Sequence, residues 1–99
     1  MLEQRFETAI HGIIREAENL TPSVKFTRLK QMVGVHGGKI AADRILANPK
    51  IGDGFTNLFM SGAENLNLSI EYLVLQEPWK QLFTQEQLQI AEKRLAEFE

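Results

Sequence analysis

Apolar residues recur every three or four positions along most of this 99-residue chain, and this spacing constrains the fold more than any other feature. In residues 2–20 the repeat places an apolar stripe along one side of a helix and leaves most charged residues off it. The stripe consists of Leu2, Phe6, Ile10, Ile13, Ala17 and Leu20. We therefore predict a long amphipathic helix at residues 2–20.

Prolines, glycines and capping residues divide the rest of the chain into shorter helices. Thr21 and Pro22 predict a second helix that begins there and ends at His36, before Gly37 and Gly38. The remaining helices are expected at residues 39–47, after a cap at Asp53, after a cap at Ser69, around Trp79, and after a capping box formed by Thr84 and Gln87. Ser23 is also expected to cap a helix. Residues 66–75 alternate apolar and polar side chains, but a lone strand there would leave its backbone unpaired.

The sequence thus predicts an all-α fold, a compact orthogonal domain of six or seven short helices that occupies residues 1–99. A composition of 43% apolar and 24% charged residues is typical of a globular domain. The chain has no cysteine, which excludes disulfides, thiolate catalysis and cysteine zinc sites. No apolar run is long enough to span a membrane, so we expect a cytoplasmic protein.

Charge is distributed unevenly, although the net charge is only −2. Residues 22–50 carry six cations against Asp43 alone, whereas residues 51–99 carry three cations against eight anions. Two explanations remain open: the basic segment binds an anionic partner, or it pairs with the acidic parts of the same chain. The candidate contacts for an anionic partner are Lys25, Arg28, Lys30, His36, Lys39, Arg44 and Lys50.

No residue pattern in the chain matches a known enzyme site, so we expect no catalytic, metal-binding or cofactor-binding residues. The glycines around His36 lack the spacing of a phosphate loop, and no serine stands in a nucleophile elbow. His11 lies four residues after Glu7, which predicts a solvated pair on one helix. His36 is expected to cap the carbonyl groups at the end of its own helix; a small enzyme centred on His36 is the least favoured alternative.

Two kinds of binding surface are consistent with the sequence. The segment 25–50 has the outline of a helix-turn-helix whose second helix would present Lys39, Asp43 and Arg44 to DNA. The first helix could instead join two copies of the chain, because its stripe recurs close to every seven residues. The residues expected on that oligomer face are Phe6, Ile10, Ile13 and Ala17.

Several short motifs resemble those of a widespread group of uncharacterised bacterial small helical proteins. The motifs are Phe26–Leu46, with its Val-His-Gly-Gly-Lys segment, then Gly54–Leu58, Leu66–Leu75, Trp79–Thr84 and Ala91–Leu95. Members of this group stand alone or form a C-terminal accessory module on larger proteins, some of them nuclease-like or associated with defence. The similarity covers residues 26–96; the first helix, Gly34 and Val35 depart from it. The resemblance implies a bacterial or phage origin and an accessory role, and it transfers no catalytic residue.

From these observations we expect a non-enzymatic helical interaction module that binds a protein partner or a second copy of itself. DNA binding through residues 25–50 is the alternative.

Overall fold

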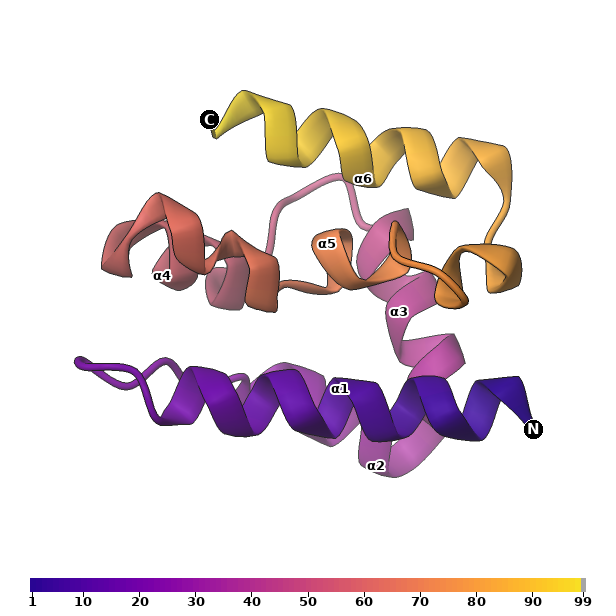
Figure 1. Ribbon diagram of the computed structural model, residues 1–99, viewed down its shortest axis with the longest axis horizontal. Helices are drawn as coiled ribbons and strands as arrows, with labels where there is room; N and C mark the ends of the chain where they lie inside the picture. The colour runs from indigo at the N-terminus through magenta and orange to yellow at the C-terminus, as the bar shows by residue number, and fades with distance from the viewer. Residues whose placement is uncertain (99) are drawn as a thin grey trace.

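Residues 1–98, the part of the chain that the computed structural model describes, contain six α-helices and two short 3₁₀ segments (Figure 1). In chain order these elements are α1 (Leu2–Glu18), α2 (Thr27–His36), α3 (Gly38–Ala47), α4 (Asp53–Ser61), η1 (Ala63–Leu68), α5 (Ile70–Val74), η2 (Trp79–Leu82) and α6 (Gln85–Glu97). These residues include no strand, so the predicted all-α fold is confirmed. The competing strand at residues 66–75 is instead the end of η1 followed by α5.

The helices are arranged around α3, which runs steeply across the others. Figure 1 shows α1 and α6 on opposite sides of the molecule, with α4, η1 and α5 between them. Helix α3 contacts α1, α2, α5 and α6, and the buried apolar residues of all these elements form a single core. The steep crossing of α3 agrees with the predicted orthogonal arrangement.

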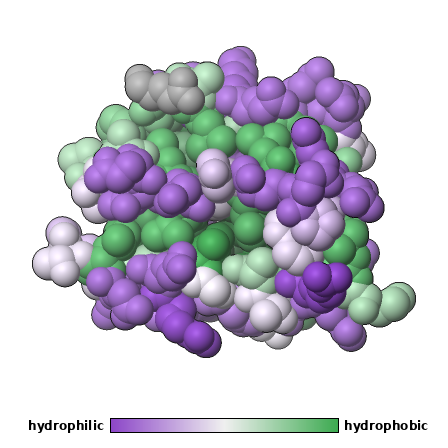
Figure 2. All heavy atoms as spheres, viewed as in Figure 1, coloured by the Kyte–Doolittle hydropathy of each residue, from purple (hydrophilic) through white to green (hydrophobic). Residues whose placement is uncertain are grey.

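Polar residues cover the outer sides of the helices, and apolar residues fill the furrows between them (Figure 2). This distribution is the one expected when each helix turns one apolar face toward a common core. None of the described helices has both the length and the hydrophobicity that crossing a membrane requires.

The apolar stripe of α1 lies inside the core, so the prediction that it forms an oligomer face is wrong. Phe6, Ile10 and Ala17 are 0% exposed, and Ile13 is 8% exposed. Helix α1 covers α3, η1 and η2, and the ring of Phe6 packs 5.7 Å from that of Trp79. The apolar stripe that suggested contact with a second copy of the chain packs instead against α3, η1 and η2 of the same chain.

The second helix begins at Thr27, five residues later than Pro22, where the sequence predicted its start. Residues before it are held in a non-helical segment because the Val24 N–H donates to the Ala17 carbonyl at 3.0 Å, and because Val24 and Phe26 are buried. Ser23 therefore caps no helix. Because Val24 and Phe26 are held in the core in this way, the helix starts only after them, at Thr27.

Two of the predicted helix caps are confirmed, those at Ser69 and Thr84. Ser69 accepts a hydrogen bond from the Tyr72 N–H at 3.1 Å, and Thr84 and Gln87 form the predicted capping box. Asp53 does not act as a side-chain cap: Gly52 holds that position, and Asp53 is the first residue of α4. Its carboxylate still lies in the first helical turn, where the helix dipole favours a negative charge.

Candidate functional site

A pocket of about 420 Å³ opens where the beginnings of α2, α4 and α5 meet, and we call it the α2–α4 pocket. Its volume lies within the range typical of ligand and anchor sites. The pocket has an apolar floor and a polar rim. The apolar residues are Phe26, Leu29, Met32, Ile45, Phe55 and Ile70, and the polar or charged residues are Lys25, Thr27, Arg28, Gln31, Asp53, Asn57, Ser69 and Glu71.

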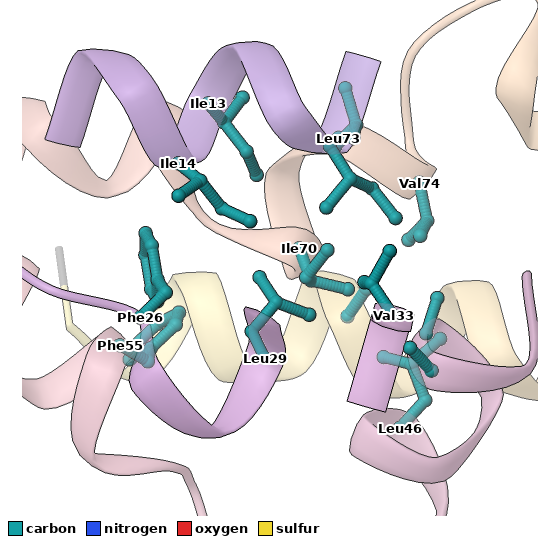
Figure 3. Close-up of a cluster of buried hydrophobic side chains, with 14 of the residues drawn as sticks. Ile13, Ile14, Phe26, Leu29, Val33, Leu46, Phe55, Ile70, Leu73 and Val74 are labelled. Carbon is teal, nitrogen blue, oxygen red and sulfur yellow. The ribbon is translucent and has the colours of Figure 1, made fainter. Parts of the chain in front are cut away.

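Close packing of Phe26 over Gly54 shapes one wall of this pocket. A Cβ atom added at Gly54 would lie 2.3 Å from Cδ1 of Phe26, which leaves no room for any side chain there. Figure 3 shows Phe26 beside Phe55, with Leu29 and Ile70 further along the same cluster. Three segments that are distant in sequence thus meet at one wall because their apolar residues share the core.

A buried ion pair includes one of the lining residues of the pocket, Glu71. Glu71 as a whole is only 2% exposed; its Oε2 atom accepts a hydrogen bond from Nη1 of Arg94 at 3.0 Å. Arg94, on α6, also donates to the backbone carbonyls of Ile45 and Asn48 at the end of α3. Because this guanidinium binds three acceptors, it links α6, α5 and the loop after α3, and it fixes where the Glu71 side chain lies.

Ser69, the buried hydroxyl of the lining, is fully engaged in local structure. Its Oγ donates to the Leu66 carbonyl at 2.7 Å and accepts from the Tyr72 N–H at 3.1 Å. The hydroxyl thus donates its proton to a backbone carbonyl and not to a side-chain base, and its role is that of a helix cap.

Two of the predicted basic contacts, Lys25 and Arg28, lie on the rim of the pocket. Both are exposed, and neither forms a salt bridge within residues 1–98. Asp53 is the acidic residue on the exposed rim, and its charge is stabilised by the start of α4. The rim thus offers two cations for which the described part of the chain supplies no anion.

A second hollow of about 480 Å³ adjoins the pocket, and we call it the Met60 hollow. It shares Lys25 and Asn57 with the first pocket, and Met60 on its wall is 77% exposed. The two hollows together form one indented surface beside the segment that joins α1 to α2.

Other members of the predicted basic set are already paired within the chain. Lys30 forms an ion pair with Glu18 of α1. Lys39 binds Asp43 at 2.7 Å, and Asp43 also accepts a hydrogen bond from Gln87 of α6 at 2.9 Å. Lys30 therefore pairs with an acidic part of the chain, and Lys39 pairs with the one anion of its own basic segment. Lys25 and Arg28 form no ion pair within residues 1–98, and binding of an anionic partner through them stays a prediction.

Arg44, Lys50 and His36 are exposed and line neither hollow. The imidazole of His36 makes no hydrogen bond with the described residues, so the predicted cap is wrong; the Gly37 N–H caps α2 by donating to Val33. The predicted pair of His11 with Glu7 is also wrong among these residues, because Glu7 binds the backbone of α3 instead. The helix dipole suggested the His36 cap, and the four-residue spacing suggested the pair of His11 with Glu7. Neither property accounts for a partner on a neighbouring helix, such as the Gly38 N–H that binds Glu7.

The pair α2–α3 differs in two ways from a helix-turn-helix. Only Gly37 separates the two helices, whereas that motif uses a turn of three or four residues. The second helix, α3, is enclosed by four neighbours, and Lys39 and Asp43 are occupied by each other. Within residues 1–98 no group of three or more His, Asp or Glu residues is arranged to hold a metal ion.

Sequence reasoning missed Glu71 and Arg94 as members of the site. Glu71 stood in the first turn of a predicted helix, which explained its charge, and Arg94 belonged to an acidic terminal segment. One signal was present in the sequence: Arg94, one residue before Leu95, stands close to the apolar positions of α6.

Searches with protein-family models, against curated proteins and against solved structures give no match to this chain. The family resemblance of residues 26–96 remains a prediction.

Proposed function

We propose that this chain is a non-enzymatic interaction module that binds a partner protein through the α2–α4 pocket and the adjoining Met60 hollow. The observation that carries the proposal is the composition of the pocket: an apolar floor surrounded by exposed polar residues. Protein interfaces have this anatomy, with an apolar centre that receives an anchor side chain and a polar rim. The exposed Met60 extends the apolar surface, and methionine is enriched in interfaces.

Three further features favour this role over the alternatives. Ser69, the buried hydroxyl of the pocket, is used as a cap, which does not favour an enzyme. Lys39 and Asp43 are paired on an enclosed helix, which does not favour DNA readout by α3. The stripe of α1 is buried, so dimerisation through it has no support. A bacterial or phage origin, which the resemblance implies, and a place in the cytoplasm, which the absence of a long apolar run suggested, belong to the same proposal.

Binding of a purified partner to matched variants tests the proposal. Thr27→Trp places a bulky ring at the mouth of the pocket, on an exposed position of α2, and Glu92→Trp places the same ring on exposed α6. Partner candidates are isolated from an extract of the source organism, purified, and measured by calorimetry against the intact chain and both variants. We expect Thr27→Trp to abolish binding and Glu92→Trp to leave it intact. A partner that binds Thr27→Trp as tightly as the intact chain would show that the pocket is not its site.

A further inference from the structure

The floor of the α2–α4 pocket is suited to an aromatic side chain. Phe26 and Phe55 stand side by side on its wall (Figure 3), and Met32, Ile45 and Ile70 complete the apolar lining. Aromatic rings pack favourably against the faces and edges of other rings, and methionine adapts to them. A volume of about 420 Å³ accepts one such ring together with part of the chain that carries it.

The base of the pocket offers a hydrogen-bond acceptor. Glu71 lines the pocket, and its Oε2 atom is taken by Arg94, but no hydrogen bond from residues 1–98 reaches its Oε1 atom. In the same residues no side-chain oxygen or nitrogen is both sealed from solvent and without a partner, so Oε1 is not fully sealed, although Glu71 as a whole is only 2% exposed. A hydrogen bond to a charged carboxylate oxygen is stronger than one between neutral groups, so a donor that reaches Oε1 from the pocket would stabilise an occupant.

The rim favours negative charge next to the occupant. Lys25 and Arg28 have no ionic partner within the described chain, whereas the charge of Asp53 interacts with the start of its own helix. Acidic residues on either side of an inserted ring would find these two cations. Such rim pairs contribute mainly to orientation and to the rate of association.

We propose that the pocket accepts a tyrosine side chain from an acidic segment of the partner protein, an inference that rests on the function proposed above. Tyrosine combines the three required features: an apolar ring for the floor, a phenolic O–H that donates to Oε1 of Glu71, and a short stem that leaves flanking residues at the rim. Phenylalanine lacks the donor. Lysine and arginine would bring a positive charge past Lys25 and Arg28 and would place little apolar surface on the floor.

Fluorescence anisotropy with short labelled peptides tests the inference. The probe is a peptide in which one tyrosine stands between glutamates, and two matched peptides replace the tyrosine by phenylalanine or the glutamates by glutamine. We expect the phenylalanine peptide to bind about tenfold more weakly, because one hydrogen bond to a charged group is lost. The glutamine peptide is expected to bind more weakly than the probe by about threefold at low salt, and this difference should vanish at high salt.

Variants of the protein locate the binding. Arg28→Ala should weaken the glutamate probe and leave the glutamine peptide unchanged, whereas Lys93→Ala removes an exposed cation on α6 and should change neither. Glu71 is kept intact because its loss would leave Arg94 buried without its partner; the exchange of tyrosine for phenylalanine tests the same contact.

Equal affinity of the tyrosine and phenylalanine peptides, or no binding of the tyrosine probe, overturns the inference. If the purified partner still loses binding to Thr27→Trp in that case, the pocket remains its site and the proposed tyrosine chemistry is wrong. If the partner ignores Thr27→Trp, the proposed function itself has failed.

Discussion

The Oε1 atom of Glu7, on α1, accepts a hydrogen bond of 2.8 Å from the backbone N–H of Gly38 at the start of α3. A side chain of α1 thus caps the start of α3, and the two residues in this contact are 31 positions apart in the sequence. The two helices approach closely here, since a Cβ atom on Gly38 would lie 3.0 Å from both Cα and Cβ of Glu7. This contact joins α1 to the start of the central helix, which also packs against α2, α5 and α6.

Removing the Glu7 carboxylate should destabilise the fold through the start of α3. We expect Glu7→Ala to lower the free energy of unfolding by about 1 kcal/mol, the typical cost of losing a helix cap. Urea denaturation followed by circular dichroism measures the change. Glu16→Ala, an exposed position on the same helix, is the control and should change stability by less than about 0.5 kcal/mol. Equal losses in the two variants would contradict the capping role of Glu7.

Two glycines should respond in opposite directions to the same substitution. Gly54→Ala puts a methyl group against the ring of Phe26, and we expect a loss of about 1–3 kcal/mol from overpacking. Gly34 lies inside α2, and a Cβ atom there would meet nothing within 4 Å. Gly34→Ala should therefore stabilise the protein by about 0.5–1 kcal/mol, because alanine favours the helix. Thermal unfolding of both variants checks the opposite signs.

Arg94 should be the most important charged residue for stability. Arg94→Ala leaves the Glu71 carboxylate buried without its partner, and breaking such a pair typically costs about 3–5 kcal/mol. The adjacent Lys93→Ala is an exposed control and should change stability by less than about 0.5 kcal/mol. A double-mutant cycle with Glu71→Ala measures the coupling of the pair; near-additive losses would show that the two charges act independently.

Truncating a residue of the α1 stripe tests whether the stripe stabilises the core of one chain or an interface between two copies. Because Ile10 is fully buried within one chain, Ile10→Ala should lower the free energy of unfolding by about 2–5 kcal/mol. Sedimentation velocity of the intact chain and the variant reports any change of oligomeric state in parallel. A variant that keeps the stability of the intact chain but loses a dimer would restore the interface interpretation.

Some of the fold could be predicted because the signals are local. Spacing of apolar residues indicated α1 and α6, and the hydroxyl groups of Ser69 and Thr84 marked two helix starts. These interactions join residues at most four positions apart, so the sequence contains all of the partners. The start of α2 was predicted too early because a distant contact, between Val24 and Ala17, competes with the local preference.

The candidate site was only partly predictable for the same reason. Charge patterning drew attention to Lys25 and Arg28, but it ranked them equally with Lys30 and Lys39, which the fold pairs with anions. The spacing of Lys39 and Asp43 is that of neighbours on one helix, whereas the partner of Lys30 lies on α1 and only the packing of helices brings the two together.

By itself, the sequence determined that this chain is helical, cysteine-free and divided at particular caps and glycines, because those properties depend on neighbouring residues. Tertiary structure alone decided which apolar stripe is buried, that Lys30 pairs with a residue of another helix, and that the starts of α2, α4 and α5 enclose a pocket lined in part by Glu71. Those outcomes depend on which surfaces meet when the helices pack, and packing joins residues whose separation along the chain carries no information about their contact.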